Sequence, residues 1–364
     1  LLVGRYVRNF GARHVLVVSD PGVMEAGWGA EVIAALDAEG ISHELFTEIS
    51  PNPRSAQVMN GAAFYDQKNC DVIVAVGGGS VIDCAKALGI VCTNRKPVLE
   101  FEGVDMVPVP MPPIVCIPTT GGTSADVSQF AIVTNEFERV KIAIVSKSVV
   151  PDVALVDPRT LTSMGPMLTG CTGMDALVHA VEAYVSNANS DLTDLHALEA
   201  IRLISKHLVA SVKNGEDLEA RRGVMLASLQ AGLAFSNASL GAVHAMAHSL
   251  GGMLDLPHGE CNAMLLPHVV QFNHQAVPER FFEIGKALGL DMDKRGPDEA
   301  RAAVVAGIQE LRLATGTSAT LGARGVSRSD VAVLSKKAMA DPCIATNPRR
   351  PVQRDIEVIY EEAL

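Results

Sequence analysis

The first 160 residues alternate short runs of β-branched residues with amphipathic stretches of helical period. The runs HVLVVSD (14–20), ISHELFTEI (41–49), DVIVAVGGGS (71–80) and PPIVCIPTT (112–120) predict strands, because each is short, largely apolar and bounded by turn-forming residues. Strands that alternate with single helices at this spacing are typical of a parallel, doubly wound sheet. We therefore expect an α/β domain over residues 1–160.

From residue 161 onward the apolar positions recur with the period of an α-helix over long stretches. This pattern predicts helices at about 170–186, 191–212, 217–236, 239–253 and 278–289, with more after 298. The segment PDVALVDPRTL (151–161) carries two prolines just before the change and is the expected connection between the two parts. We therefore expect an all-helical domain over residues 161–364, following the α/β domain.

Composition then narrows the classes of function. Acidic residues outnumber basic ones by 41 to 30, for a formal net charge of −11, and no long Lys/Arg cluster occurs, so nucleic acid and anionic membrane surfaces are poor partners. No run approaches 18 consecutive apolar residues, which argues against a membrane span. Seven scattered cysteines without a C-x-x-C pair indicate a reducing compartment, and we expect a cytoplasmic protein. The start at Leu1, without Met, suggests that native residues precede it.

Candidate metal ligands gather on the predicted helices of the second half. Asp175 and His179 are four residues apart, and His244 and His248 repeat that spacing, so each pair lies on one helix face. His258 follows in the turn LPHGE, and His268 and His274 come later, in LLPHVVQFNH. Imidazoles with one carboxylate suit Fe²⁺, Zn²⁺ or Mn²⁺, and burying several polar groups is costly without a common partner. A single buried histidine is more often a hydrogen-bonded core residue, and spacing alone leaves open which three histidines are ligands.

Candidate dinucleotide contacts lie where predicted strands end. Asp20 closes the first strand, where a carboxylate can accept hydrogen bonds from a ribose 2′-hydroxyl and would repel a 2′-phosphate, which favours NAD over NADP. It can equally cap the helix that follows. Gly77, Gly78, Gly79 and Ser80 link a strand to a helix and would let backbone amides approach a diphosphate. The G-x-G-x-x-G fingerprint is absent, and a tight connection explains this turn equally well.

Four segments resemble the group III, iron-containing alcohol dehydrogenases: GGGSVIDCAKA, IPTTGGTSADVSQFAIVTN, GMDALVHAVEAYVS and GAVHAMAHSLGGMLDLPHGECNAMLLPHV. The similarity extends over essentially the whole chain. It implies a dehydroquinate synthase-like architecture, in which a Rossmann-like dinucleotide-binding domain precedes an all-helical metal-binding domain. It also implies that one divalent metal, usually iron, is held by Asp175, His179, His244 and His258. His248 matches a histidine that lies close to the nicotinamide and the substrate without binding the metal.

The same resemblance assigns the cofactor contacts. The GGGS block matches the family's diphosphate loop. Thr119 and Thr120 would lie near adenine and ribose, and Ser124 near the phosphates or nicotinamide. Asn52 matches a residue near the adenosine end, and Lys141 a lysine at the nicotinamide ribose. The loop TTGGTSAD departs from the commoner pattern, since Asp126 stands where many members have Glu.

These observations predict a metal-dependent alcohol dehydrogenase that interconverts a small primary alcohol or diol and its aldehyde by hydride transfer with NAD. His248 would relay the proton to solvent or orient its neighbours. Because relatives assemble, we expect a homodimer or a larger homo-oligomer. The alternative is a metal- and NAD-dependent lyase or polyol dehydrogenase of the dehydroquinate synthase or glycerol dehydrogenase type. A lyase acting on a phosphorylated acid needs Lys/Arg near the metal, and none stands beside a histidine block.

Overall fold

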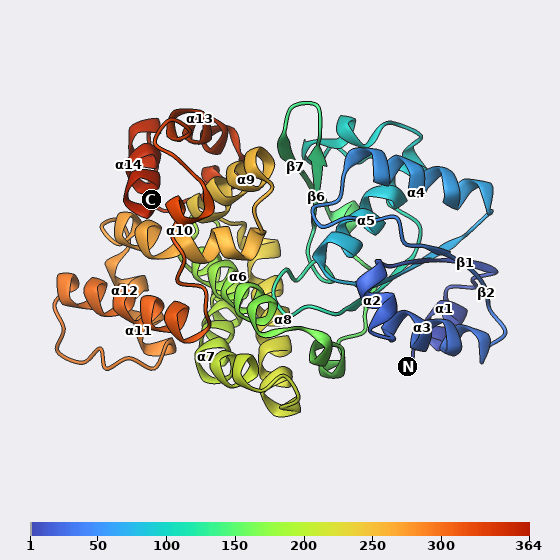
Figure 1. Ribbon diagram of the computed structural model, residues 1–364, viewed down its shortest axis with the longest axis horizontal. Coiled ribbons are helices and arrows are strands. Elements are labelled where there is room, and N and C mark those ends of the chain that lie inside the picture. The colour runs from blue at the N-terminus through green and yellow to red at the C-terminus, as the bar shows by residue number, and fades with distance from the viewer. Residues whose placement is uncertain (1) are drawn as a thin grey trace. The chain divides into compact units, whose positions relative to one another are not determined.

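The computed structural model describes residues 2–364, so the expectation about residues preceding Leu1 lies outside it. The chain divides into two compact units. The sheet unit comprises the residues up to Thr120 together with Ser124–Ser163, and the helical unit comprises Gly121–Thr123 together with Met164–Leu364. The first unit is α/β and the second consists of helices, as the ribbon shows from blue to red (Figure 1). The predicted fold class, an α/β part followed by an all-helical part, is confirmed.

The sheet unit is built on a five-stranded sheet in which every neighbouring pair is parallel, in the order β2-β1-β3-β5-β8. Its strands are β1 (His14–Val18), β2 (Ser42–Phe46), β3 (Val72–Gly77), β5 (Ile114–Pro118) and β8 (Val153–Ala154). Its helices are α1 (Val3–Asn9), α2 (Pro21–Glu25), α3 (Trp28–Asp37), α4 (Ser55–Gln67) and α5 (Gly79–Asn94). Strand β3 is buried along its whole length, as its unbroken apolar run predicts.

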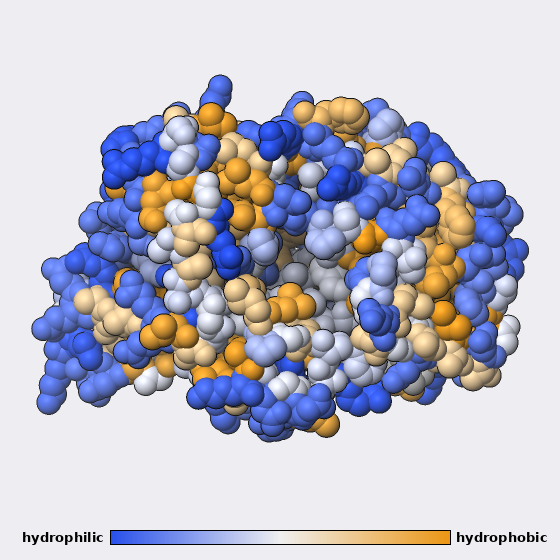
Figure 2. Space-filling model, viewed as in Figure 1, coloured by the Kyte–Doolittle hydropathy of each residue, from blue (hydrophilic) through white to orange (hydrophobic). Residues whose placement is uncertain are grey.

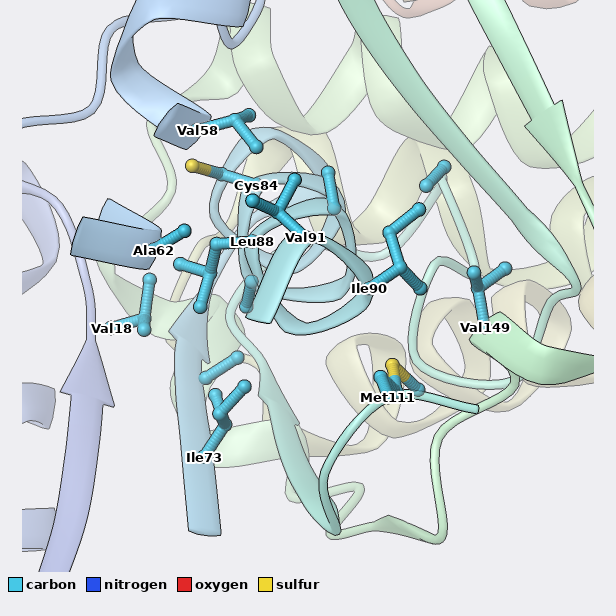
Figure 3. Close-up of a cluster of buried hydrophobic side chains, with 14 of the residues drawn as sticks. Val18, Val58, Ala62, Ile73, Cys84, Leu88, Ile90, Val91, Met111 and Val149 are labelled. Atoms are coloured by element: carbon cyan, nitrogen blue, oxygen red, sulfur yellow. The ribbon is translucent and has the colours of Figure 1, made fainter. Parts of the chain in front are cut away.

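A second, three-stranded sheet was not predicted from the sequence. Strands β6 (Phe130–Asn135) and β7 (Val140–Val145) form an antiparallel hairpin, and β4 (Gly103–Val104) pairs with β7 in parallel. Helix α5 is buried continuously from Cys84 to Cys92. In Figure 3, Leu88 lies near Ala62 and Ile73, and Ile90 points toward Met111 and Val149. This core fixes α5, and therefore the position of its glycine-rich first turn.

The helical unit contains nine α-helices within the described residues: α6 (Pro166–Val185), α7 (Asp191–Lys213), α8 (Leu218–Ala238), α9 (Ala242–Leu254), α10 (His258–Asn273), α11 (Pro278–Ala287), α12 (Pro297–Ala314), α13 (Val331–Ala340) and α14 (Gln353–Ala363). Helix α6 packs against α7, α8 and α10. It is buried continuously from Thr169 to Val185, so its few ionisable side chains must find partners inside the unit. One detail differs from expectation, because His258 begins helix α10 instead of standing in a turn.

All seven cysteines are buried and free. Hydrophilic residues cover much of the face seen in Figure 2, with smaller hydrophobic areas among them. The most exposed large apolar side chains, such as Phe137 and Leu192, come from different elements. Among residues 2–364, no helix combines the length and apolar character that a membrane crossing requires.

Candidate functional site

Helix α6 carries three polar side chains on one buried face. Asp175, His179 and Glu182 follow one another at helical spacing, and each is less than 5% exposed. His179 Nδ1 lies 3.1 Å from the carbonyl oxygen of Gly122, so a proton on Nδ1 donated to that oxygen leaves a lone pair on Nε2. A Cβ atom at Gly122 would lie 2.3 Å from the carbonyl oxygen of Thr172, so only glycine allows this approach.

His244, on α9, is oriented by Glu182. Glu182 Oε2 lies 2.6 Å from His244 Nδ1, and Oε1 accepts the backbone N–H of Val243 at 2.6 Å. Because a carboxylate only accepts, the imidazole proton lies on Nδ1 and Nε2 keeps its lone pair. Burial raises the pKa of Glu182 to about 7, against the effect of the backbone donors. Burial, together with the nearby His179, holds the pKa of His244 well below its usual value, so the ring is neutral.

Three candidate ligand atoms converge in this region. Asp175 Oδ1 lies 3.8 Å from His244 Nε2 and 3.7 Å from His258 Nε2. The ligand atoms of these three residues all lie within 4.8 Å of one another. Within the described residues this compact group does not include His179. The His179 ring instead stacks between two neighbours, with its centroid 4.5 Å from that of His244 and 4.3 Å from that of Phe235. The structure thus brings all four predicted ligands into one cluster, three of them with converging atoms.

The donor set of this cluster suits a divalent metal. It offers the buried imidazoles of His179 and His244, the half-buried imidazole of His258 and the buried carboxylate of Asp175, which are ligands that Fe²⁺, Zn²⁺ and Mn²⁺ accept. Two of the imidazoles have an acceptor at Nδ1, Gly122 for His179 and Glu182 for His244, an arrangement that orients metal-binding histidines. Glu182 was missed by sequence reasoning, although its position seven residues after Asp175 places it on the same helix face.

His248 has a different partner. Its Nδ1 lies 2.8 Å from Asp341 Oδ2, and its ring stacks on that of His258 with centroids 5.3 Å apart. Asp341 Oδ1 accepts the backbone N–H of Cys343 at 2.8 Å and so begins the short helix that follows α13. Burial would raise the pKa of Asp341, but His248 and these hydrogen bonds hold it below its usual value. Sequence reasoning had no signal for Asp341, which lies 93 residues from His248.

Asn262 lies directly against the three converging atoms. It follows His258 by one helical turn on α10 and is fully buried. Its side-chain Nδ2 is 2.6 Å from Asp175 Oδ1 and 3.2 Å from Nε2 of both His244 and His258. Sequence reasoning missed this residue because it placed His258 in a turn, which hid the four-residue spacing.

In the sheet unit, the glycine block stands at the carboxyl end of β3. Gly77 ends the strand, Gly78 is the N-cap of α5, and Gly79 and Ser80 form its first turn, where amides are free to bind an anion. A Cβ atom at Gly78 would lie 3.1 Å from the side chain of Thr120. Thr120 Oγ1 is buried and has no hydrogen-bond partner among the described residues.

Three predicted cofactor residues meet near this turn. The backbone N–H of Asn52 donates to Ser80 Oγ at 3.3 Å, and Lys141 Nζ donates to Asn52 Oδ1 at 2.7 Å. Asn52 has a φ of +58°, in the left-handed region that asparagine tolerates. Thr119 donates its backbone N–H to the carbonyl of Gly77 at 2.9 Å, next to this group.

Asp20 caps a helix, which is one of its two predicted roles. Its Oδ1 accepts the backbone N–H of Val23 at 2.9 Å at the start of α2. The other role, a contact with a ribose, stays a prediction.

The segment that carries Ser124 and Asp126 is hydrogen-bonded to a buried lysine of α5. Both side chains are buried. Lys86, which is fully buried on α5, donates from Nζ to the carbonyls of Ser128 at 2.8 Å and Phe130 at 2.9 Å. Burial raises the pKa of Asp126 to about 6, although Lys86 opposes the shift. Burial also lowers the pKa of Lys86.

Nearly the whole chain matches known protein families and individual known proteins. The family description "Iron-containing alcohol dehydrogenase" matches residues 2–158, and "Fe-containing alcohol dehydrogenase family, C-terminal" matches residues 169–364. Alcohol dehydrogenase 4 of Schizosaccharomyces pombe is 39% identical over 362 residues, which is 99% of this chain and 84% of that protein. The 1,3-propanediol dehydrogenase of Klebsiella pneumoniae is 38% identical over 364 residues, which is 100% of this chain and 94% of that protein.

Solved structures give the same result. A 1,3-propanediol oxidoreductase superposes with a TM-score of 0.97 at 38% identity, over 100% of this chain and 95% of that one. An alcohol dehydrogenase from Oenococcus oeni also reaches a TM-score of 0.97, at 34% identity, over 100% of this chain and 95% of that one.

Proposed function

Since the chain belongs to the iron-containing alcohol dehydrogenase family, we propose that it oxidises a small primary alcohol or diol with NAD, and reduces the matching aldehyde. A divalent metal, Fe²⁺ in the first place, is held by Asp175, His179, His244 and His258. The observation that carries the proposal is the convergence of Asp175 Oδ1 with Nε2 of His244 and His258 in a buried cluster. Relatives named 1,3-propanediol dehydrogenase and NAD-dependent methanol dehydrogenase support the substrate class.

When bound, a divalent metal supplies Lewis acidity that lowers the pKa of an alcohol and polarises a carbonyl. The chain contributes the orientation of the ligands. Glu182 keeps the proton of His244 on Nδ1, and the carbonyl of Gly122 does the same for His179, so both Nε2 lone pairs are available without a rearrangement. Because these groups are buried, their charges and dipoles act in a medium that weakens them little.

His248 is placed to take part in proton transfer. With Nδ1–H donated to Asp341, its Nε2 carries a lone pair that can accept a proton from an alcohol. Asp341 fixes this tautomer and the ring orientation, because its second oxygen is itself held by the backbone of Cys343. In the direction of aldehyde reduction the same nitrogen returns the proton.

We assign NAD binding to the sheet unit, within a domain of residues 1–160, and metal binding to a domain of residues 161–364. The first turn of α5 would receive the diphosphate. The hydroxyl of Thr120, which has no hydrogen-bond partner among residues 2–364, fits a ligand beside that turn. The remaining contacts that we propose are Asp20, Asn52, Gly77, Gly78, Gly79, Ser80, Thr119, Ser124 and Lys141. The hydride chemistry belongs to the cofactor, and these residues set its position.

The test is spectrophotometric. Protein purified without oxygen and loaded with Fe²⁺ is mixed with NAD and a panel that includes 1,3-propanediol and methanol, and NADH formation is followed by its near-ultraviolet absorbance. We expect turnover in the wild type. His258→Ala should lose both bound metal and at least about 10³-fold in kcat/KM. No NADH formation from any alcohol, or a His258→Ala variant with full metal content and activity, would contradict the proposal.

The assembly and the compartment are proposed with it. We expect a cytoplasmic homodimer or larger homo-oligomer, and light scattering during size-exclusion chromatography measures the mass directly. A monomer at micromolar concentration would contradict the assembly without affecting the proposed reaction.

A further inference from the structure

Asn262 makes a set of contacts that its neighbours on α10 do not share. Its amide nitrogen is within hydrogen-bond distance of three acceptors, Asp175 Oδ1 at 2.6 Å and Nε2 of His244 and of His258 at 3.2 Å each. An amide nitrogen carries two hydrogens and can only donate. The three neighbouring atoms therefore face this nitrogen as acceptors, and its two hydrogens can satisfy at most two of them at a time.

The oxygen of the same amide, unlike its nitrogen, lacks a partner among the described residues. Asn262 Oδ1 is buried and has no hydrogen-bond partner among the described residues. A buried amide oxygen without a donor costs stability. The side chain is therefore held in place by the contacts of its nitrogen, and not by those of its oxygen.

The acceptors that Asn262 contacts are the same atoms that would bind a metal. Glu182 fixes the proton of His244 on Nδ1, which forces the Nε2 lone pair toward Asn262. A buried carboxylate and two imidazole lone pairs that face one another are poorly tolerated unless a positive charge or a donor lies between them. A metal supplies the charge, and Asn262 supplies the donor.

We propose that Asn262 is a positioning residue that takes the place of the metal in the metal-free protein. It keeps the lone pairs of Asp175, His244 and His258 directed at a common point, and it gives up its contacts with the two histidines when the metal binds. This inference rests on the metal site proposed above and adds a role to it. It implies that Asn262 stabilises the metal-free state more than the metal-loaded state, and so lowers the metal affinity.

The chain offers a matched control in Asn273. It lies on the same helix and is 2% exposed. It exchanges two side-chain hydrogen bonds with Asn347, of 3.0 and 2.7 Å, and no candidate ligand. Loss of its amide should destabilise the metal-free and the metal-loaded protein equally.

The experiment compares wild type, Asn262→Ala and Asn273→Ala, each stripped with a chelator and then loaded with Zn²⁺, which avoids the oxidation of iron. The readouts are the thermal midpoint with and without Zn²⁺ and the Zn²⁺ affinity from competition with a coloured chelator. For Asn262→Ala we expect the Zn²⁺-induced rise in Tm to exceed that of wild type by about 3–8 °C. We expect its Zn²⁺ affinity to be about 5- to 30-fold tighter. Asn273→Ala should show the wild-type rise and the wild-type affinity.

An equal Zn²⁺-induced rise in all three proteins, or a weaker affinity in Asn262→Ala, would overturn the inference, because Asn262 would then only support the bound ligands. That result leaves the metal site standing. If wild type itself takes up no Zn²⁺, the metal site fails and this role fails with it.

Should Asn262→Ala not fold, Asn262→Leu removes the donor while keeping the volume, and the same differences are expected. A measurement on wild type alone serves as well. The side-chain NH₂ of Asn262 should exchange slowly with solvent in the metal-free protein and should change its resonance on Zn²⁺ binding. An unchanged resonance would overturn the proposal.

Discussion

The two units hold their candidate chemistry in different ways. In the helical unit the groups are side chains on long buried helices, and several have a dedicated partner, such as Glu182 for His244 and Asp341 for His248. In the sheet unit the groups are largely backbone amides and loop side chains around the first turn of α5. If the proposed sites are right, a substitution in the helical unit would remove a reacting group or its orientation. A substitution in the sheet unit would then shift the position of the cofactor or the preference for it.

The two units also differ in the partners of their buried ionisable side chains. Glu182 and Asp341 each combine an imidazole partner with backbone donors. In the sheet unit, Lys86 is fully buried and its hydrogen bonds run to two backbone carbonyls, while Asp126 carries a pKa raised by burial. The helical unit should thus be the more sensitive to loss of partners, whereas both units should respond to pH, because burial raises the pKa of Glu182 to about 7 and that of Asp126 to about 6.

The largest effect is expected from Asp341→Asn. The oxygen of the new amide can still accept the N–H of Cys343, but the NH₂ group facing His248 Nδ1 favours the other tautomer and moves the proton to Nε2. We expect kcat to fall about 10²–10⁴-fold, while the KM for NAD and the metal content stay near wild type. Steady-state kinetics with elemental analysis checks this. A fall of less than about threefold would show that His248 does not depend on this carboxylate.

The second prediction concerns pH and the sheet unit. The folded-state pKa of Asp126 is about 6, above its ordinary value of 3.8, so ionisation of this carboxyl opposes folding. Its contribution to stability is fully present below about pH 4 and is lost as the pH rises through about 6. Relative to wild type, Asp126→Asn should gain about 2–3 kcal/mol between pH 4 and pH 7.

Trp28, the only tryptophan, lies in the sheet unit and reports its unfolding in urea by fluorescence. Urea midpoints of wild type and Asp126→Asn are compared across this pH range. Asp105→Asn, an exposed position in the same unit, is the control and should show a constant difference. A constant difference in Asp126→Asn as well would mean that the carboxyl is not desolvated.

The third prediction returns to the helical unit. Glu182→Gln removes the charge that fixes the tautomer of His244, and we expect a 10- to 100-fold loss of metal affinity, measured by chelator competition. Glu260→Gln is the matched control, because Glu260 is also buried in this unit but pairs with Arg324. Equal losses of metal affinity in the two variants would point to general destabilisation of the helical unit. They would then not support a dedicated role of Glu182 in orienting His244.

The smallest effect is expected at Asp20. Asp20→Ser keeps a good N-cap for α2 but removes the negative charge, so the preference for NAD over NADP, as a ratio of kcat/KM values, should fall about tenfold. Asp20→Ala loses the cap as well and should cost about 1 kcal/mol of stability. An unchanged ratio in both variants would leave Asp20 with its capping role alone.

Part of this picture was readable from the sequence. The pairs Asp175/His179 and His244/His248 stand at helical spacing inside apolar stretches, so their shared faces follow from periodicity. Spacing did not say which histidines are ligands, and the choice of His258 came from the family resemblance. The role of Asp341 could not be predicted from the sequence, because its contact with His248 joins distant segments. A tertiary contact of this kind leaves no local pattern.

The sheet unit was harder to read for a physical reason. The strands were visible as apolar runs, but the hairpin of β6 and β7 was missed because its residues do not alternate cleanly between buried and exposed. Lys86 was not singled out from the sequence, because its contacts are with backbone carbonyls, which every residue has. Contacts made by the main chain do not depend on which side chain a residue carries, so the sequence does not reveal them.

Because all seven cysteines are buried, we expect the folded protein to react slowly with thiol-directed reagents. Burial raises the pKa of Cys84 and of Cys116, which keeps these thiols protonated as well as covered. A maleimide dye should therefore leave the native chain unlabelled, and a cysteine engineered at an exposed site would become its single point of attachment. One such site in each unit would carry a donor and an acceptor fluorophore, and their energy transfer would follow the distance between the units as alcohol and cofactor are added.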